Sequence, residues 1–328
     1  MEHKNITVAL DGTGGDLNCI DGCVRAVEFA LTLYPSMRIM VFGPSLLKTS
    51  LQKIRGYQDR IDFVLAPMGI PQDEDPRAVL AGYAQSAMRL CLEAVKARKA
   101  DAVVSAGGTG PLVVLSRHIL GTFGNVHPAL CSRLPAGGNK RYTLMMDMGA
   151  NARSSADDLY DFARLGSAAA KILLSNSAPH TAVLNIGTEE DKGNMQVRQA
   201  RDLIKSDPRL LFDGFIEPNR IFCGDVDVIV TDGFTGNVAL KAAEGVAGIF
   251  ARTSFLKRIL VRLSWPEWLI PWQYNGSLLL GVDGVVVKSH ANAPDHALAV
   301  AMVEAARAVN SGLLEGMKKD KLLEKLDG

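Results

Sequence analysis

The sequence predicts an α/β protein with an open, mainly parallel sheet and helices on both faces of the sheet. Three observations support this prediction. Short apolar runs rich in β-branched residues alternate along the chain with longer segments of helical periodicity. Glycine-rich or polar loops follow five of the predicted strands. The 328 residues are 48% hydrophobic, which is ample for a buried core in one large domain or two smaller ones.

Composition and charge exclude several classes of function. The net charge is +1 and no basic stripe or recognition motif is present, so nucleic acid binding has no support. The N-terminal MEHKNITVAL lacks the pattern of a signal peptide, and no apolar run is long enough to span a bilayer. We therefore expect a cytoplasmic protein. Five scattered cysteines indicate reduced thiols rather than zinc ligands or disulfides.

In the first half of the chain, each predicted strand is a short apolar run followed by turn residues. The predicted strands are Ile6–Leu10, Arg38–Phe42, Ile61–Leu65 and Ala102–Ser105. Helical periodicity predicts a helix over Ile20–Leu33 and a long one from the linker Pro67–Pro76 to about Arg98. A further helix is predicted from Pro111, because proline is favoured at the first helical position.

The second half repeats this alternation. The predicted strands are Tyr142–Met146, Thr181–Asn185, Val226–Val230 and Gly284–Val287. Helices are predicted near Ser155–Ser175, from Val238 onward and at about Pro294–Gly312. We interpret 1–314 as a single α/β domain carrying a helical projection at about 246–272. The charged tail 315–328 is predicted to be a solvated helix end.

Five loops follow the predicted strands, at 11–16, 107–110, 147–151, 186–193 and 232–237. Ligands of open α/β sheets bind outside the carboxyl ends of the strands, so these loops are predicted to converge on one crevice. None of them is a G-x-G-x-x-G fingerprint or a Walker A loop, so a nicotinamide or ATP site has no direct support.

The segment Asp225–Gly245 is the most informative of these units. A short apolar strand, a glycine-punctuated loop and a helix start follow one another, which is the arrangement of an anion site. Thr235 and Asn237 add side-chain donors, and Asp232 adds an acceptor or a base. The alternative is an ordinary strand–helix turn with a capping residue.

The loops supply backbone and amide donors but no activated serine and no evident cysteine–histidine pair. Such a site suits a nucleophile that is itself an oxyanion, such as phosphate, because only positioning and charge dispersal are then needed. Among the six histidines, His290 follows a predicted strand and could donate to a leaving group or to phosphate; it could equally be a structural loop residue.

The segment Ser254–Trp272 holds all three tryptophans of the chain. Its first part is amphipathic and basic, and Pro266 and Pro271 end the helix and carry a tryptophan-rich loop. This pattern favours contact with a bilayer surface or a hydrophobic partner, whereas the alternatives are a dimer interface or a buried hairpin. The contact residues predicted are Phe255, Leu256, Ile259, Trp265, Trp268 and Leu269.

Taken together, the loops resemble the PlsX family of phosphate acyltransferases. The matching stretches are DMGAN at 147–151, LNIGTEEDKG at 184–193, DGFTGNVALKAAEG at 232–245 and QYNGSLLLGVDGVVVKSH at 273–290. DGTGGD at 11–16 and SAGGTGPL at 105–112 fit more loosely. The resemblance covers nearly the whole chain.

The resemblance implies a Rossmann-like α/β/α sandwich related to the isocitrate and isopropylmalate dehydrogenases, with a hydrophobic helical projection, assembled as a homodimer. It implies that the chain makes acyl phosphate from fatty acyl-[acyl carrier protein] and inorganic phosphate in phospholipid synthesis, with no metal or redox cofactor. It also implies peripheral membrane association and functional coupling to a membrane glycerol-3-phosphate acyltransferase.

The chain departs from the family pattern mainly in its N-terminal half. Gly12-Thr13 replaces a methionine-containing pair, Gly108 replaces an asparagine, and Ala291 replaces a glycine. Asp75-Pro76-Arg77 and Ser86-Ala87-Met88 replace two further family motifs. Two alternatives therefore stay open: a phosphate acyltransferase that uses coenzyme A as the acyl carrier, and a catalytically reduced scaffold that binds acyl carrier protein or membrane.

The resemblance and the residue types together yield one assignment of roles. The residues predicted to be catalytic are Asp232, Asn237, His290 and Lys192. The residues predicted to bind phosphate or substrate are Gly107, Gly108, Thr109, Gly110, Asn151, Gly233, Thr235 and Gly236. Loop amides would stabilise the oxyanion, and Asp232 or His290 would manage the proton or orient the phosphate.

Overall fold

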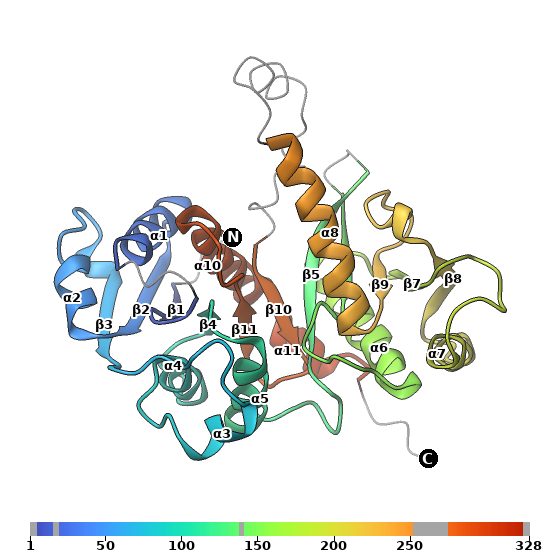
Figure 1. The fold of residues 1–328 in the computed structure, drawn as a ribbon, viewed down its shortest axis with the longest axis horizontal. Coiled ribbons are helices and arrows are strands. Elements are labelled where there is room, and N and C mark those ends of the chain that lie inside the picture. Colours follow the sequence, from blue (N-terminus) through green and yellow to red (C-terminus); the bar gives the residue numbers. More distant parts are fainter. Residues whose placement is uncertain (1–4, 16–19, 138–140, 252–274, 324–328) are drawn as a thin grey trace. The chain divides into compact units, whose positions relative to one another are not determined.

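The computed structural model describes residues 5–15, 20–137, 141–251 and 275–323 (Figure 1). Its chain divides into two compact units. Unit 1 consists of Met1–Pro128 and Asn275–Gly328, and unit 2 consists of Ala129–Tyr274. The assignment of 1–314 to a single domain stays a prediction, and each unit is described by itself.

Unit 1 is built on a largely parallel sheet with the strand order β3-β2-β1-β4-β11-β10. The pairs β3–β2, β2–β1, β1–β4 and β4–β11 are parallel, and β10 runs antiparallel to β11. The strands are β1 (Ile6–Asp11), β2 (Met37–Gly43), β3 (Ile61–Leu65), β4 (Ala102–Ser105), β10 (Ser277–Leu280) and β11 (Val285–Lys288). In register, Leu10 pairs with Val41 on one side and Val104 on the other, and all three are fully buried. Such runs are apolar because both faces of a parallel sheet are covered.

Helices cover this sheet. They are α1 (Ile20–Leu33), α2 (Ser45–Leu51), α3 (Pro76–Ala81), α4 (Ala87–Lys96), α5 (Thr109–Leu120), α10 (Asp295–Asn310) and α11 (Leu313–Lys319), with a 3-10 turn at Gln58–Arg60. The helix α10 packs against α1 and β1, and Figure 1 shows α1 and α10 side by side. Its buried face is rich in alanine, for example Ala301 and Ala305, which permits a close approach to its neighbours.

The region 77–98 corrects one prediction. It forms two helices, α3 and α4, instead of one long helix. Gly82 ends α3, Tyr83 adopts a left-handed backbone conformation with φ of 55°, and the Ser86 hydroxyl accepts the N–H of Arg89 to begin α4. The apolar periodicity continues across this break, so the break is not visible in the periodicity alone.

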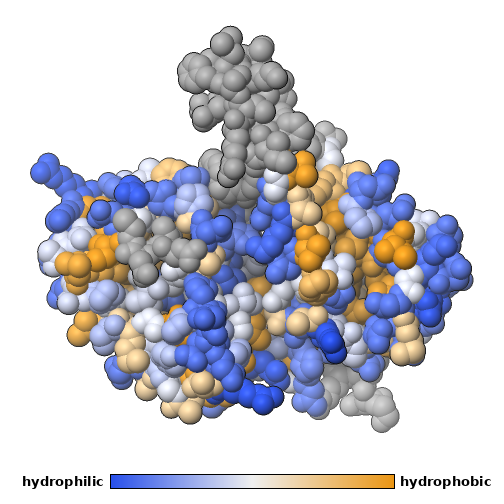
Figure 2. Space-filling view, in the orientation of Figure 1, coloured by the Kyte–Doolittle hydropathy of each residue, from blue (hydrophilic) through white to orange (hydrophobic). Residues whose placement is uncertain are grey.

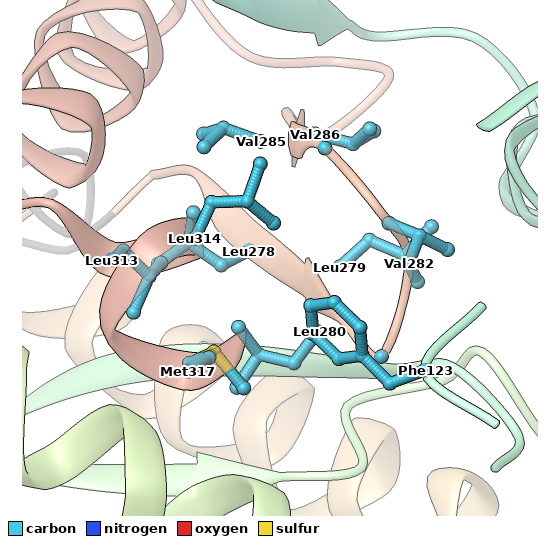
Figure 3. A pocket seen from close by; sticks show the side chains of 12 residues that line it. Phe123, Leu278, Leu279, Leu280, Val282, Val285, Val286, Leu313, Leu314 and Met317 are labelled. Atoms are coloured by element: carbon cyan, nitrogen blue, oxygen red, sulfur yellow. The ribbon is translucent and has the colours of Figure 1, made fainter. Parts of the chain in front are cut away.

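An apolar pocket between the β10–β11 hairpin and α11 belongs to the core of unit 1 (Figure 3). Leu278, Leu280 and Met317 line it, and each is nearly inaccessible to solvent. Its volume is about 10 Å³, the smallest space that holds one water molecule. It is therefore a packing gap, too small for an acyl chain.

The C-terminal tail corrects the expectation of a solvated helix end. Met317 in α11 and Leu322 after it both bury their apolar side chains.

Unit 2 has the strand order β5-β6-β9-β7-β8. Only β5–β6 is antiparallel; β6–β9, β9–β7 and β7–β8 are parallel. The strands are β5 (Ala129–Ala136), β6 (Arg141–Met146), β7 (His180–Leu184), β8 (Leu211–Ile216) and β9 (Val228–Val230). The helices are α6 (Ala156–Leu173), α7 (Met195–Ser206) and α8 (Gly233–Ala251), with a 3-10 turn at Pro218–Arg220.

Sequence patterns missed three strands, β5, β8 and β10, and the helices α2 and α7. The strand β8 reads LFDGFI, in which Asp213 and Gly214 interrupt the apolar run. The helix α7 is strongly polar, with only Ala200 and Ile204 buried, so its apolar stripe is narrow.

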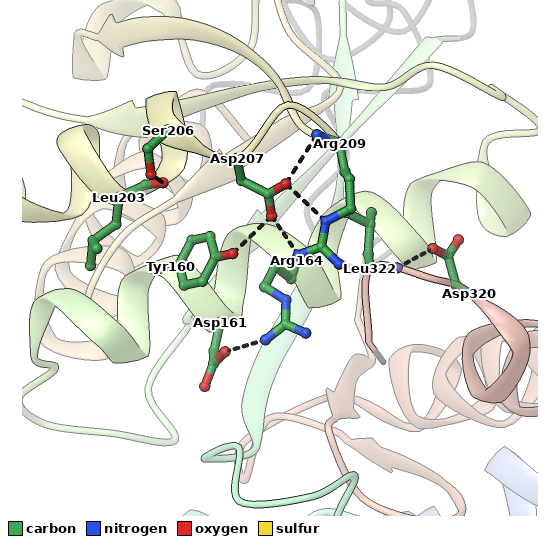
Figure 4. Close-up of polar contacts among 9 residues, drawn as sticks. All are labelled: Tyr160, Asp161, Arg164, Leu203, Ser206, Asp207, Arg209, Asp320 and Leu322. Atoms are coloured by element: carbon green, nitrogen blue, oxygen red, sulfur yellow. Dashed lines mark hydrogen bonds and ion pairs between the residues drawn. The ribbon is translucent and has the colours of Figure 1, made fainter. Parts of the chain in front are cut away.

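A buried carboxylate anchors the end of α7 (Figure 4). Asp207 accepts hydrogen bonds from the Tyr160 hydroxyl at 2.8 Å and from the backbone N–H of Arg209 at 3.0 Å. The Arg209 guanidinium adds bonds from Nε at 2.8 Å and from Nη2 at 2.7 Å. These bonds, chiefly those from Arg209, hold the pKa of Asp207 well below its usual range.

Among the described residues, no single helix is long and apolar enough to cross a membrane. The helices α10 and α11, bent by 46° at their junction, meet the length and composition requirement only as a pair.

Candidate functional site

The first part of the candidate site is a turn that Asp147 organises at the end of β6. This side chain is fully buried. One carboxylate oxygen accepts the N–H groups of Leu130 at 2.9 Å, Gly149 at 3.1 Å and Ala150 at 2.9 Å. The other accepts the backbone N–H of Asn151 at 2.7 Å and its side-chain amide at 2.9 Å. The motif DMGAN is therefore a turn folded around its own aspartate.

The surroundings of the Asp147 carboxylate indicate that this side chain holds the 147–151 turn in place. Burial raises the pKa of this carboxyl group, and the N–H groups of Ala150, Leu130 and Asn151 oppose that shift because they stabilise the charged form. Five donors on one carboxylate leave little capacity for substrate. Asp147 positions the turn, while Asn151, which was predicted to bind phosphate, lies at its end.

The second part of the site is the start of α8. The helix begins at Gly233, which corrects the prediction that 232–237 is a loop and that the helix starts at Val238. Asp232 caps it: its carboxylate accepts the backbone N–H of Thr235 at 2.9 Å and the Thr235 hydroxyl at 2.7 Å, and its carbonyl accepts the N–H of Gly236. The N–H groups of Gly233 and Phe234 have no acceptor within the helix, because no earlier turn of the helix precedes them. N–H groups at a helix start can bind an anion.

Glycines bring these two parts together. A Cβ at Gly236 would lie 2.1 Å from the carbonyl oxygen of Asp147, and one at Gly233 would lie 2.4 Å from the carbonyl oxygen of Asn151. The amide nitrogen of Asn237 lies 3.1 Å from the Cβ position of Gly149. The first turn of α8 thus packs directly onto the 147–151 turn. The structure brings Asn151, Gly233, Thr235, Gly236 and Asn237 together in unit 2.

Beside this contact lies an open hollow of about 630 Å³ in unit 2, referred to below as the α6–α8 hollow. Its walls come from three places: Ala152–Ser154 ahead of α6, the first turn of α7 with Gln196 and Val197, and the start of α8 with Asp232, Phe234 and Thr235. A volume of this size suits a ligand as large as a drug or a coenzyme fragment. Sequence reasoning singled out Asp232 and Thr235 but missed Arg153, Gln196 and Phe234.

Lys192 does not line the α6–α8 hollow. This residue is exposed, and its side chain lies beside Gly187, within 3.2 Å of that residue's Cβ position. Its backbone N–H donates to the Glu189 carbonyl, so the segment closes on itself as a turn.

In unit 1, a second aspartate organises the loops. Asp11 is buried at the end of β1 and accepts the Ser105 hydroxyl at 2.7 Å and both the N–H and the hydroxyl of Thr13. The Ser105 hydroxyl in turn accepts the N–H of Gly107 at 3.0 Å. A Cβ at Gly14 would lie 2.6 Å from the Gly107 nitrogen, so the loops 11–15 and 105–110 are in contact.

The predicted phosphate loop 107–110 is the start of α5, which begins at Thr109 rather than at Pro111. A neighbouring segment lies against it. A Cβ at Gly108 would meet the Gln72 carbonyl oxygen at 2.8 Å, and one at Gly110 would meet Pro76 at 2.7 Å. The Gln72 amide also donates to the Ala106 carbonyl at 3.2 Å. Position 108 therefore has no room for a Cβ, because the segment around Gln72 lies too close to it.

Other departures from the family pattern also have local roles. Asp75 caps α3 by accepting the N–H of Arg77, and Ser86 caps α4. Thr13 bonds to Asp11. In this chain, these residues therefore form capping and turn contacts.

His290 lies in the loop after β11, in unit 1. Its N–H donates to the Asn275 side chain at 3.1 Å, and the adjacent Ser289 donates its N–H to the Ser105 carbonyl at 2.9 Å. The Asn275 amide donates to the Ser289 hydroxyl and to the Ala297 carbonyl. The structure thus places the His290 loop beside the Ser105 loop. Sequence reasoning gave no role to Asn275, which is 3% exposed, although this residue lies in the matching stretch 273–290.

The predicted residues therefore fall into two groups. Gly107, Gly108, Thr109, Gly110 and His290 belong to unit 1, and Asn151, Lys192, Asp232, Gly233, Thr235, Gly236 and Asn237 belong to unit 2. The predicted contact residues Phe255, Leu256, Ile259, Trp265, Trp268 and Leu269 lie outside the described residues. Within the described part of the chain, no three His, Cys, Asp or Glu side chains are placed to hold a metal ion.

Comparisons with known proteins agree on a family. A model of the family described as "Fatty acid synthesis protein" matches residues 6–315. The phosphate acyltransferase of Aeromonas salmonicida (strain A449) is 42% identical over 317 residues, which cover 92% of each chain. That of Moritella marina is 40% identical over 326 residues, covering 94% of this chain and 96% of the relative.

Solved structures share the fold. A phosphotransacetylase from Streptococcus pyogenes has a TM-score of 0.63 at 18% identity and covers 93% of this chain and 94% of its own. The EutD phosphotransacetylase from Staphylococcus aureus has a TM-score of 0.59 at 17% identity, covering 93% and 95%. These likenesses confirm the predicted α/β architecture. The family model and the curated relatives show more: the chain belongs to the PlsX family of phosphate acyltransferases.

Proposed function

We propose that this protein transfers a fatty acyl group from acyl-[acyl carrier protein] to inorganic phosphate and releases acyl phosphate. One observation of unit 2 carries the proposal. The capped start of α8 packs onto the 147–151 turn, and this places the leading N–H groups of α8 and the amides of Asn151 and Asn237 in one region. Rigid donors of this kind suit a tetrahedral phosphate and a developing oxyanion.

The proposed step is a phosphorolysis of a thioester. A phosphate oxygen attacks the thioester carbonyl carbon and forms a C–O bond. The tetrahedral intermediate collapses, the C–S bond breaks, and its electron pair leaves with sulfur. The proton of hydrogen phosphate neutralises the thiolate, so that acyl phosphate and free thiol result. The barrier falls through positioning and oxyanion stabilisation, and no protein nucleophile is required.

Asp232 and His290 remain the candidates for handling the proton. Both carboxylate oxygens of Asp232 accept bonds from Thr235, so its first role is to cap α8. A proton relay through Asp232 would use the remaining lone pairs of these oxygens. The imidazole of His290 can donate or accept a hydrogen bond.

Acyl-phosphate formation from purified long-chain acyl-[acyl carrier protein] and phosphate, trapped with hydroxylamine, tests the proposal. We expect phosphate-dependent product with the wild-type protein and a loss of about 10²-fold or more with Asn237→Ala. Lys241→Ala, an exposed substitution on the same helix, is the matched control and retains turnover. Full turnover by both Asn237→Ala and His290→Ala would refute the site assignment. An acyl-coenzyme A arm tests the alternative donor.

We further propose a homodimer that contacts the membrane peripherally and delivers acyl phosphate to a membrane glycerol-3-phosphate acyltransferase. The tryptophan-rich segment 254–272 supports this proposal. The double variant Trp265→Ala/Trp268→Ala should lose sedimentation with anionic liposomes while its mass in solution stays that of the wild type. Sedimentation retained by this variant would refute the membrane role.

A further inference from the structure

We propose that the α6–α8 hollow binds the 4′-phosphopantetheine arm of the acyl donor, with Arg153 as the cation for its phosphate. The inference rests on the proposed function for the donor's identity. It assigns a ligand to a hollow of about 630 Å³ whose walls include Asp232 and Thr235 at the start of α8. The hollow therefore adjoins the region proposed for the reaction.

The first argument is charge. Arg153 is exposed on the wall of the hollow, and none of the described residues forms an ion pair or hydrogen bond with its guanidinium. The other arginines of this unit whose side chains the structure describes are partnered, for example Arg209 with Asp207 and Arg220 with Asp225. An arginine on a concave wall that forms no ion pair is suited to a phosphate group, which it can bind with two parallel hydrogen bonds.

The second argument is the alternation of polar and apolar groups. A pantetheine arm carries two amides and a geminal dimethyl group between its phosphate and its thioester. The hollow offers Gln196 and Ser154 as hydrogen-bonding side chains, and the Ser154 hydroxyl has no partner among the residues that the structure describes. Buried polar atoms are normally satisfied, so this hydroxyl is suited to a ligand amide.

Phe234 and Val197 supply the apolar wall. The Phe234 side chain is 68% exposed, which is unusual for an aromatic residue in the first turn of a helix that packs against a turn. Phe234 is in the first turn of α8, and Figure 2 shows hydrophobic residues along the exposed side of this helix. A geminal dimethyl group resting on Phe234 would remove this surface from water.

Coenzyme A and acyl carrier protein both present this arm, so the shared chemistry is the phosphopantetheine thioester. The decisive comparison is between acyl-phosphopantetheine and acyl-pantetheine, which differ only in the phosphate. We expect Arg153→Ala to raise the KM for the phosphorylated donor about tenfold, the loss of one charge-assisted contact, with kcat unchanged. The KM for acyl-pantetheine should stay that of the wild type.

Two controls sharpen the test. Arg55→Ala removes an exposed arginine of unit 1 that has no partner among the described residues, and it should leave both KM values unchanged. Phe234→Ala should raise the KM for both donors, because it contacts the part of the arm that both share. The KM values for acyl-coenzyme A and acyl-[acyl carrier protein] then show which carrier makes additional favourable contacts outside the shared arm.

Direct binding separates this inference from the proposed function. Calorimetric titration with S-methyl phosphopantetheine, which cannot react, should give about tenfold weaker binding to Arg153→Ala than to the wild type. Equal binding to the two proteins, or an equal change in KM for both donors with Arg153→Ala, would overturn the inference. A wild-type protein that binds this compound but forms no acyl phosphate would refute the proposed function and retain the site.

Discussion

At the scale of single residues, the candidate site depends on glycines whose missing Cβ atoms make room for backbone. Gly236 has the closest of these contacts, because any Cβ there would lie 2.1 Å from the Asp147 carbonyl oxygen. Gly245 lies further along the same helix, where a Cβ meets nothing within 4 Å. The two positions therefore form a matched pair.

Gly236→Ala should separate α8 from the 147–151 turn. We expect a loss of stability of about 1–3 kcal/mol from overpacking and a drop in turnover of about a hundredfold from displaced donors. Gly245→Ala should keep turnover and stabilise α8 by about 0.5–1 kcal/mol. Thermal denaturation and the hydroxylamine assay measure both effects. A wild-type turnover rate in Gly236→Ala would show that this contact does not position the donors.

Asp207 provides a second residue-scale prediction. Its folded-state pKa lies below the unfolded value of about 3.9, so its contribution to stability is present above that pH and disappears as the pH falls through the folded pKa. Asp207→Asn should lower the free energy of unfolding by about 1–3 kcal/mol at pH 7. The difference from the wild type should shrink below about pH 4.

The control is Asp202→Asn. Asp202 pairs with Arg201 at 2.7 Å, but its side chain is 64% exposed. Exposed pairs contribute about 0–1 kcal/mol, so this variant should unfold close to the wild-type temperature. A difference between Asp207→Asn and the wild type that persists unchanged at acid pH would contradict the assigned charge of Asp207.

Residue types in the sequence indicated several of these roles, and the structure altered others. Asp232 was predicted as an acceptor or base, and the structure shows it capping α8. Asp147 was predicted only as one of the charged groups of the loops, and the structure shows that it accepts five hydrogen bonds. An aspartate in a turn looks the same in sequence whether it faces substrate or its own backbone, because only burial distinguishes the two.

At the scale of elements, helix starts carry much of the site. The helix α6 begins with a capping box, in which the Ser155 hydroxyl accepts the N–H of Asp158 and the Asp158 carboxylate accepts the N–H of Ser155. Ser155 follows directly on Ala152–Ser154, which line the α6–α8 hollow.

Ser155→Ala should therefore destabilise the protein by about 0.5–2 kcal/mol through the loss of this cap. The exposed Ser177, for which the structure records no hydrogen bond, gives the control Ser177→Ala, which should leave the thermal midpoint unchanged. Equal midpoints for the two variants would mean that the cap contributes nothing to the folded state.

Sequence patterns located the boundaries of elements unevenly. The strands β4 and β3 were predicted at Ala102–Ser105 and Ile61–Leu65, as the structure has them. The starts of α5 and α8 were placed too late because their first turns contain glycines, which usually indicate a loop. Here the glycines are inside the helix, since tertiary contacts require residues without Cβ atoms.

At the scale of the whole molecule, the chain has little net charge, so general electrostatic attraction to anions is weak. Phosphate should bind through its site alone. At a phosphate concentration ten times its Kd, ligand linkage contributes about 1.4 kcal/mol. This corresponds to a rise in Tm of about 2 °C for a chain of this length.

Differential scanning calorimetry in phosphate and in chloride at matched ionic strength measures this shift. The Gly236→Ala variant should lose it, because its donors are displaced. An equal rise of Tm in chloride would show that the effect of phosphate is a general salt effect.

The sequence by itself determined the α/β class, the family and the loops that follow the strands. These features depend on local patterns: apolar periodicity, turn residues and short motifs that stay adjacent along the chain. Only the structure shows which aspartates bind their own turns and why Gly108, Gly233 and Gly236 have no room for a Cβ. It also shows that the starts of three helices line an open hollow. Those properties arise where segments distant along the chain come within a few ångströms of one another, and close packing there leaves room for one backbone path.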